Sequence, residues 1–590
     1  MFQTFDASSS PEQGPPRLKK LRERLGDEGY DGFIVPRADA YQGEYVADCD
    51  ARLAWLTGFT GSAGFCIVLK DIAGVFVDGR YRTQVKAQVN TGHFTPVNWP
   101  ETKPAAWIKE QTQSAKIAFD PWLFTKSQID EIKKGLDSTA VTLHPTQNFV
   151  DMIWQDRPAK PNAKVEAYPL ELSGKTSSDK RADTAAILKK SGHKCAVLTL
   201  PDSICWLLNI RGQDIPRNPI VQCFALIHDD ARVDLFIDEA RLAHLSPDPA
   251  TTICPPESFP QTLKTLQGPV RVDAGTAPLQ VSEMLKHTDI AYADDPCILP
   301  KAIKNPTEIE GTRAAHMRDA HAMVEFLAWL DAQPPGTTTE IDVATALEGF
   351  RAKTNMLRDI SFETIAGSGP NGAIMHYRVT DETNRSLQDG ELIVVDSGGQ
   401  YLDGTTDITR TVAIGQPTEE QRICFTLVLQ GMIAISQTRF PRGYAGRDLD
   451  ALARAPLWRH GFDFNHGTGH GVGVYLSVHE GPQRLSRVSE VALKPGMILS
   501  NEPGYYREDA FGIRIENLIV VEAAPALGDN RDQLQFETLT WVPIDRRLIV
   551  TDMLSPAERT WIDSYHAEVA RRLDVEGRAQ SWLTAVTAPL

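Results

Sequence analysis

Long apolar runs and an excess of basic residues are both absent from this sequence of 590 residues. No stretch approaches the roughly 18 consecutive apolar residues of a membrane-spanning helix, so we expect no membrane span. Lysine and arginine number 61 against 77 aspartate and glutamate residues, which gives a formal net charge of −16. Nucleic acids and anionic membranes attract basic surfaces, so we expect neither of them as a partner.

Cysteine is also sparse. The eight cysteines are scattered and form no Cys-x-x-Cys pair. In a chain of this length they are typical of small buried side chains in a reducing compartment. The first residues show no basic stretch followed by an apolar core, so no secretory signal is predicted. We therefore expect a cytoplasmic protein.

A phosphate-binding loop is missing as well. Residues 56–64 are rich in glycine and read Leu-Thr-Gly-Phe-Thr-Gly-Ser-Ala-Gly. This segment has no lysine at the place where such a loop needs one. We therefore reject a nucleotide-binding α/β protein as an interpretation.

What the sequence does contain is a set of carboxylates within apolar, β-branched runs that predict strands between residues 391 and 517. Asp396 directly follows Leu-Ile-Val-Val, and Glu516 directly precedes Asn-Leu-Ile-Val-Val. Asp407 is separated by two or four positions from the threonines at 405, 409 and 411. Side chains in a strand alternate between its two faces, so these residues are predicted to share one face. A carboxylate inside such a strand costs free energy unless something pairs with it.

His470 and Glu502 lie in glycine-flanked segments beside these predicted strands. Together the four carboxylates and one imidazole form an oxygen-rich set, which suits Mn²⁺ or a similar ion better than a thiolate-bound metal. Four negative charges also balance two dications. Any one of these acids alone can be read as an ordinary strand-end or salt-bridged residue. The five together predict a site for two divalent metal ions.

The order Asp…Asp…His…Glu…Glu and its flanking motifs resemble the pita-bread metallopeptidases, which include methionine aminopeptidase, prolidase, aminopeptidase P and creatinase. His-Gly-Thr-Gly-His-Gly-Val-Gly (466–473) and Asn-Glu-Pro-Gly-Tyr-Tyr (501–506) are most similar to the aminopeptidase P branch. The resemblance implies that Asp396 chelates one metal alone. It also implies that Asp407 and Glu516 bridge both metals, and that His470 and Glu502 complete the second metal site. It also implies a metal-bridging hydroxide that attacks the scissile carbonyl, with Glu502 as general base and then acid.

Three more histidines occupy positions that match site residues of this family. The resemblance assigns His376 and His479 to substrate contact and to stabilisation of the oxyanion. It places His466 in the lining of the substrate pocket. A lone histidine is more often structural, but each of these three lies within a family motif.

Tyr506 and Arg514 are assigned to the substrate side of the same site. Tyr506 is expected to contact the substrate carbonyl. Arg514 shares a predicted strand face with Glu516 and is expected to hold an acid such as Asp396 in its chelating orientation.

The resemblance implies a metal-dependent aminopeptidase that releases the N-terminal residue from peptides with proline in the second position. Such a bond needs a dedicated pocket, because the proline nitrogen carries no hydrogen and its ring restricts the preceding residue. The expected cofactors are two divalent ions per chain, Mn²⁺ first, with Co²⁺ or Zn²⁺ as alternatives. Two other readings stay open: a prolidase- or creatinase-like hydrolase, and a non-catalytic pita-bread scaffold that binds peptides.

An α/β chain of three domains is predicted, with boundaries at 1–164, 165–304 and 305–590. Strands and helices alternate in the first two domains, and their order of elements is similar enough to suggest a duplication. The resemblance supports this, because the long aminopeptidase P subfamily carries two related creatinase-like N-terminal domains. The third domain is then the pita-bread catalytic domain with a helical C-terminal tail.

Residues 7–16 are rich in serine, proline, glycine and glutamine and predict a disordered leading segment. Two motifs have the form of a helix capping box, Thr307-Glu-Ile-Glu310 and Ser555-Pro-Ala-Glu558. Apolar periodicity predicts helices at 307–330, 341–353, 418–437 and 447–459.

After the second capping motif, four apolar residues recur at four-residue spacing: Trp561, Tyr565, Val569 and Leu573. Such a stripe belongs either to the core or to a subunit contact. Relatives of this length form dimers, so the resemblance favours a homodimer.

Overall fold

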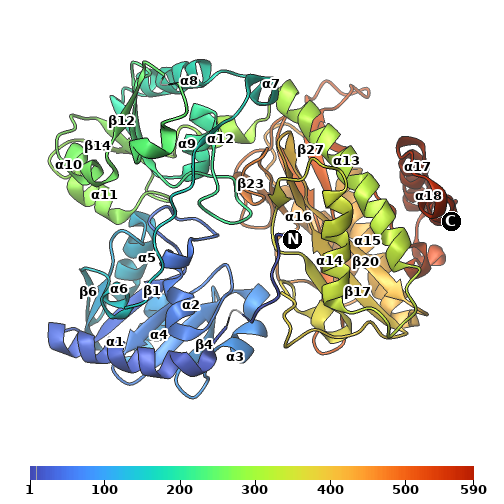
Figure 1. Cartoon of the computed structure of the whole chain (residues 1–590), viewed down its shortest axis with the longest axis horizontal. Coiled ribbons are helices and arrows are strands. Elements are labelled where there is room, and N and C mark those ends of the chain that lie inside the picture. Colours follow the sequence, from blue (N-terminus) through green and yellow to red (C-terminus); the bar gives the residue numbers. More distant parts are fainter. Residues whose placement is uncertain (8, 247) are drawn as a thin grey trace. The chain divides into compact units, whose positions relative to one another are not determined.

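The computed structural model of the chain describes residues 1–7, 9–246 and 248–590. They form two compact units (Figure 1). One unit comprises residues 1–7, 171–174 and 299–590, and the other comprises the described residues of 8–170 and 175–298. In the described part of the chain, no helix has both the length and the apolar character needed to cross a bilayer.

The unit built from the N-terminal half contains two six-stranded sheets. In the first, the order is β4-β3-β2-β1-β5-β6, with strands β1 (Gly32–Pro36), β2 (Phe65–Leu69), β3 (Ala73–Val77), β4 (Thr95–Asn98), β5 (Ser114–Phe119) and β6 (Ala140–Pro145). In the second, the order is β12-β11-β10-β8-β13-β14, with strands β8 (Cys195–Leu198), β10 (Phe224–His228), β11 (Val233–Phe236), β12 (Thr251–Cys254), β13 (Val270–Val272) and β14 (Ile290–Tyr292).

The two sheets share one topology. In each, the central strand pairs antiparallel with the next, that strand pairs antiparallel with a third, and all remaining neighbours are parallel. Two domains of separate origin would rarely share both the order and the directions of six strands. The topology therefore supports the predicted duplication.

Helix α1 (Gly14–Glu28) covers one face of the first sheet through Leu18, Leu21 and Leu25, which are buried against Phe33. Helices α4 (Pro104–Gln111) and α5 (Lys126–Leu136) pack on the opposite face. The prediction of a disordered segment at 7–16 is wrong for the described residues. A short 3₁₀ helix at Pro11–Gln13 leads straight into α1, whose first residue is already buried; Ser8 lies outside the described residues.

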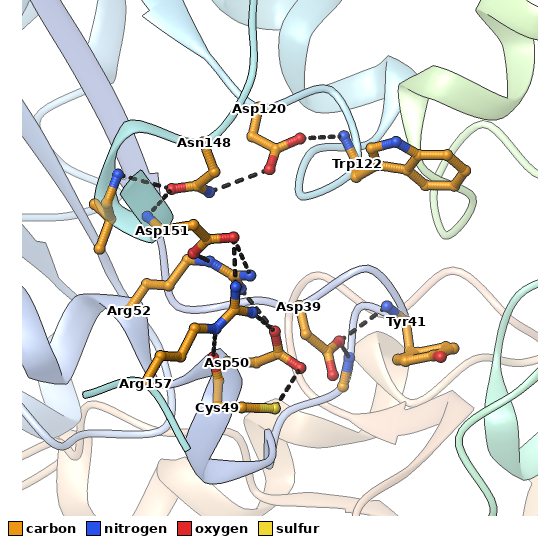
Figure 2. A network of polar contacts seen from close by, with 12 residues as sticks. Asp39, Tyr41, Cys49, Asp50, Arg52, Asp120, Trp122, Asn148, Asp151 and Arg157 are labelled. Carbon is orange, nitrogen blue, oxygen red and sulfur yellow. Dashed lines mark hydrogen bonds and ion pairs between the residues drawn. The ribbon is translucent and has the colours of Figure 1, made fainter. Parts of the chain in front are cut away.

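A network of ion pairs lies beside the carboxyl ends of β1 and β5 (Figure 2). Arg52 bonds Asp151 at 2.6 Å and Asp50 at 2.9 Å, and Arg157 bonds the same two acids at 2.7 and 3.1 Å. Each of these four charged side chains is paired with two side chains of opposite charge. The network therefore joins α2 (Arg52–Thr57) to α6 (Phe149–Ile153), which explains it as a structural clamp.

The other unit holds most of the predicted helices: α13 (Pro306–Leu330), α14 (Glu340–Ala352), α15 (Glu419–Ser436) and α16 (Arg447–Trp458). In Figure 1, α13, α14 and α15 lie along the strands of this unit, and their apolar faces form one core cluster with β17 (Glu391–Ser397) and β20 (Ile408–Ile414). The predicted capping residue of α13 is wrong. Asn305 caps the helix, with Glu308 completing the box, because an asparagine before Pro306 reaches the first free amides better than Thr307 does.

Two sheets dominate this unit. One is β16-β17-β20, with β16 at Ile365–Ser368. The other has six strands in the order β21-β28-β27-β24-β22-β23, namely β21 (Phe440–Pro441), β22 (Gly469–Gly471), β23 (Glu480–Leu485), β24 (Ile498–Asn501), β27 (Asn517–Ala523) and β28 (Gln533–Thr538). A hairpin of β25 (Gly504–Arg507) and β26 (Phe511–Arg514) lies between β24 and β27 in the sequence.

The C-terminal helix α17 (Pro556–Arg572) begins with the predicted capping box of Ser555 and Glu558. Its apolar stripe belongs to the core. Tyr565 is 4 % exposed and lies between Trp541 and Trp561, with ring centroids 5.5 and 5.1 Å away. Of the two readings of this stripe, the core reading is the one observed.

Candidate metal centre

The five predicted ligands come from separate segments of this unit and meet at one place. With His479, their ligand atoms form groups within 4.8 Å of one another: Asp396 with Asp407 and Glu516, His470 with Glu502 and Glu516, and Asp407 with His470 and His479. Asp407, His470 and Glu516 each belong to two of these groups. Of these three, Asp407 and Glu516 are carboxylates, whose two oxygens suit a residue that bridges two ions.

Asp396 is the sixth residue of β17, where it pairs with Thr409 of β20. The expectation that Asp407 shares a strand face with neighbouring threonines is wrong. Thr405 ends β19 (Gly404–Thr405), which belongs to a different sheet from β20, and Asp407 lies in the link between the two strands. The chain changes sheet here because Thr406 bonds the backbone of Gly399 in both directions.

His470 lies in β22, and Glu502 follows β24 directly. Ser500 connects them: its hydroxyl accepts a hydrogen bond from the His470 amide at 3.0 Å and donates to Glu502 Oε1 at 3.0 Å. A side chain at Gly469 would place its Cβ 1.9 Å from the Ser500 carbonyl oxygen. Glycine is therefore required beside His470 for the two strands to approach.

Glu516 lies between β26 and β27 and is held from β20. Thr409 donates its hydroxyl to Glu516 Oε2 at 2.8 Å, and the Glu516 amide donates to the Thr409 carbonyl at 3.1 Å. Thr409 and Ser500 were both missed as site residues. Ser500 lies two positions before Glu502, so its nearness to a ligand in the sequence could have found it. Thr409 acts on Glu516, 107 positions away, and no local signal identifies it.

The acids of this cluster are deeply buried: Asp396 is 8 % exposed, Asp407 3 % and Glu516 1 %. Burial is the largest effect and raises the pKa of Asp396 to about 6; the charge of Arg514 opposes it, and the charges of Asp407 and Glu502 add to it. Burial also raises the pKa of Glu516 well above its usual value, and the charge of Asp407 acts in the same direction.

His470 responds in the opposite sense. Burial by itself lowers the pKa of its imidazole, but the hydrogen bond to Asp407 and the charge of Glu502 outweigh it and raise the pKa to about 9. Its Nε2 lies 3.5 Å from Asp407 Oδ2 and 3.3 Å from Glu502 Oε1. The carboxylates of this cluster thus stabilise a positive charge that is placed among them.

Two oxygens test whether metal ions fit these residues. Asp396 Oδ1 and Glu516 Oε1 are buried and accept no hydrogen bond from the described residues. A buried carboxylate oxygen without a partner is costly, and a cation would satisfy both atoms. The donor set of four carboxylates and one imidazole also suits a hard divalent ion, so the residues fit the predicted metals.

Arg514 contacts Asp396 as predicted, with Nη2 2.6 Å from Oδ2. Its Nη1 donates to the Tyr506 hydroxyl at 2.5 Å, and that hydroxyl lies 2.9 Å from His466 Nε2. Burial raises the pKa of Tyr506 to about 12 against the opposing charge of Arg514, so the phenol stays protonated. A continuous polar chain therefore runs from Asp396 to His466.

His479 and His376 are the remaining two predicted histidines. The His479 ring is 4.3 Å from the ring of His470, at an angle of 80°, which leaves open both a substrate-facing role and a ligand role. His376 follows Met375 in a turn, and the Met375 carbonyl accepts a hydrogen bond from Arg514 at 3.2 Å. The structure thereby brings the backbone before His376 to the site.

Comparison with protein families divides the chain into four matches. Residues 310–523 match metallopeptidase family M24, and residues 532–590 match the C-terminal region of peptidase M24. Residues 17–153 and 156–308 match two creatinase/prolidase N-terminal domains. The predicted fold class, two creatinase-like α/β domains before a pita-bread domain, is confirmed.

Relatives extend this match to nearly the whole chain. A probable Xaa-Pro aminopeptidase P of Aspergillus fumigatus is 39 % identical over 97 % of this chain and 92 % of its own length. That of Coccidioides posadasii is 37 % identical over 99 % and 95 %. The chain belongs to the Xaa-Pro aminopeptidase P family. It is therefore a metal-dependent aminopeptidase, as the resemblance implied.

Solved structures agree with the family. An X-prolyl aminopeptidase from Caenorhabditis elegans, described as a cytosolic enzyme with a di-nuclear active site, is 31 % identical and covers 98 % of this chain and 100 % of its own, with a TM-score of 0.91. A prolidase from Pyrococcus horikoshii shares the fold over 62 % of this chain and 99 % of its own, at 24 % identity and a TM-score of 0.50.

Proposed function

We propose that the protein releases the N-terminal residue from peptides with proline in the second position, using two divalent ions. The ligands are those that the sequence predicted: Asp396, Asp407, His470, Glu502 and Glu516. The observation that carries the proposal is the pair of overlapping ligand groups that share Glu516, with two buried carboxylate oxygens lacking a partner. The di-nuclear description of the Caenorhabditis elegans relative supports it.

When bound, two such ions lower the pKa of water enough to supply hydroxide near neutral pH. The chain's own residues supply the rest. Glu502, held by Ser500, takes up a proton from the attacking water and passes it to the leaving amine. His376 and His479 orient the scissile carbonyl and stabilise the developing oxyanion.

The polar chain beyond Asp396 serves orientation. Arg514 fixes the Asp396 carboxylate through one nitrogen and holds the Tyr506 hydroxyl through another. His466 then lines the pocket beside Tyr506, 2.9 Å from its hydroxyl. This arrangement presents a phenolic hydroxyl and an imidazole to the substrate at fixed positions.

We propose Mn²⁺ as the native metal, because four carboxylates with a single imidazole favour a hard cation. Co²⁺ and Zn²⁺ accept the same ligands and remain the alternatives. We also propose a cytoplasmic location, which the cytosolic Caenorhabditis elegans relative supports. The domain boundaries at 1–164, 165–304 and 305–590 likewise stay proposals, supported by the two separate sheets of the N-terminal half.

A homodimer is the proposed assembly. The α17 stripe is buried within the chain, so another surface must form the contact. Helix α16 exposes two large apolar side chains, Leu452 by 40 % and Trp458 by 49 %, and we propose this helix as part of the contact. Sedimentation equilibrium of the wild type and of Trp458→Glu tests this: a monomeric wild type would contradict the proposal.

The function is tested with metal-stripped protein reconstituted with Mn²⁺ and assayed on Xaa-Pro-Yaa, Xaa-Pro and Xaa-Ala-Yaa peptides. We expect cleavage of the first alone or by a wide margin. Preference for the dipeptide would favour a prolidase-like hydrolase. Binding of Xaa-Pro-Yaa without cleavage, at full metal occupancy, would favour the non-catalytic scaffold.

A further inference from the structure

Arg410 of β20 is a buried cation beside the metal centre, with an exposed fraction of 2 %. All of its hydrogen bonds within the described residues go to neutral oxygens. A buried guanidinium usually pairs with a carboxylate, because an unpaired charge in the interior is costly. Its retention here calls for a reason beyond packing.

Three of these bonds go to the segments that hold Glu516. Arg410 Nη1 donates to the Glu516 carbonyl at 2.6 Å and to the Thr409 carbonyl at 2.9 Å. Nη2 donates to the Asn517 amide oxygen at 2.8 Å. The guanidinium therefore holds the Glu516 carbonyl and the Asn517 side chain that follows it, while Thr409 fixes the Glu516 carboxylate itself.

The other three bonds go to the C-terminal region that follows the M24 domain, residues 532–590. Nε donates to the Pro543 carbonyl at 3.0 Å, and Nη2 donates to the Val542 carbonyl at 2.8 Å and to the Tyr565 hydroxyl at 3.1 Å. One side chain thus connects the C-terminal region to the backbone of Glu516.

Tyr565 makes the C-terminal half of this connection rigid. Its hydroxyl donates toward the carbonyls of Val542 and Thr540, at 2.8 and 3.0 Å, and accepts from the Val542 amide at 3.2 Å. Its ring is stacked between two tryptophans. The oxygens that receive Arg410 are therefore held in place by α17.

We propose that Arg410 is a positioning residue for Glu516 and that the C-terminal region, through Tyr565, completes the metal centre. The proposal rests on the assignment of Glu516 as a metal ligand. On this account the C-terminal region does more than cover the core: without it the guanidinium loses half of its partners, and the Glu516 backbone loses its support.

The test measures Mn²⁺ binding to the metal-stripped full-length protein by calorimetry. Tyr565→Phe removes one hydroxyl and keeps the stacked ring; we expect the dissociation constant to rise about threefold to tenfold. Arg410→Lys keeps the charge but loses the planar fork, and a rise of about 10- to 100-fold is expected. The manganese electron paramagnetic resonance spectrum should change in both variants.

Tyr401→Phe is the matched control. Tyr401 is also buried, and its hydroxyl donates to Asp319 at 2.7 Å without contacting the Glu516 segment. We expect its Mn²⁺ affinity to stay within twofold of the wild type. Equal weakening in Tyr565→Phe and Tyr401→Phe would overturn the proposal, since both would then report a general loss of packing.

Glu516→Gln separates this inference from the proposed function. If Glu516→Gln binds both ions as the wild type does, the ligand assignment fails. If Glu516→Gln loses metal while Tyr565→Phe and a folded Arg410→Lys bind it normally, the ligand assignment stands and the positioning role is wrong. Should Arg410→Lys not fold, Tyr565→Phe alone decides.

Discussion

Metal binding should release protons from this site, and the sign follows from its electrostatics. The pKa of His470 is raised to about 9, so at pH 7 the metal-free site holds an imidazolium. An imidazolium cannot ligate a metal, and the proton must leave before the ion binds. Affinity should therefore rise with pH and level off above about pH 9.

The magnitude can be worked from the same value. Each pKa unit corresponds to about 1.36 kcal/mol, so deprotonating a group with a pKa of about 9 at pH 7 costs about 2.7 kcal/mol. From His470 alone, this predicts Mn²⁺ affinity about 100-fold lower at pH 7 than on the plateau well above pH 9, and about 50-fold lower than at pH 9 itself. Asp396, with a pKa of about 6, is mostly ionised at pH 7 and adds little there, but it weakens binding further below pH 6.

Calorimetry in buffers with different ionisation enthalpies counts the protons released at pH 7. We expect about one from His470; Glu516, whose pKa is also raised, and any metal-activated water add their own. His470→Gln isolates the His470 contribution, because an amide oxygen can ligate without titrating, and it should release one proton fewer than the wild type. Zero release at pH 7, with affinity unchanged between pH 7 and pH 9, would refute the reasoning.

Further substitutions test individual roles. Asp407→Ala should lose the metals and the activity, and metal analysis that finds full occupancy with normal turnover would contradict the bridging role. His376→Ala and His479→Ala should keep the metals but lose roughly 3–4 kcal/mol of transition-state stabilisation; loss of metal in either variant would make that histidine a ligand. Arg514→Lys keeps the charge but cannot make both contacts of the guanidinium, so we expect about 10- to 100-fold weaker metal binding, and wild-type affinity would count against it. Glu480→Gln leaves two buried lysines without their counter-charge and should cost about 3–5 kcal/mol of stability, seen as a lower melting temperature; no shift would show that solvent or another acid compensates them.

Local periodicity was sufficient to predict most elements. Helices α13 to α16 lie within a few residues of their predicted ranges, because apolar residues recur in each at helical spacing; α13, α14 and α15 also begin with a capping box. The candidate ligands could also be named, since Asp396 directly follows Leu-Ile-Val-Val, where a carboxylate is costly without a partner, and the resemblance to the pita-bread metallopeptidases assigned the individual roles. These signals are local, so they can be identified directly in the sequence.

Features that depend on distant partners could not be predicted in this way. Arg410 reads as an ordinary charged residue in an alternating strand, and only the fold shows its contacts with residues more than 100 positions away. The link at Asp407 reads as a continued strand, because the change of sheet is imposed by Gly399. The segment at 7–16 has the composition of a linker, yet a buried face on α1 orders its described part.

The ligands follow the junction between two sheets. β17 supplies Asp396 and the link before β20 supplies Asp407, whereas the six-stranded sheet supplies His470 from β22 and Glu502 from the residue directly after β24. Glu516 enters between them and bonds the β20 backbone before β27 begins. Ligand geometry is therefore set by how the two sheets pack, and residues that fix this packing without touching metal or substrate can control metal affinity as strongly as the ligands' own neighbours.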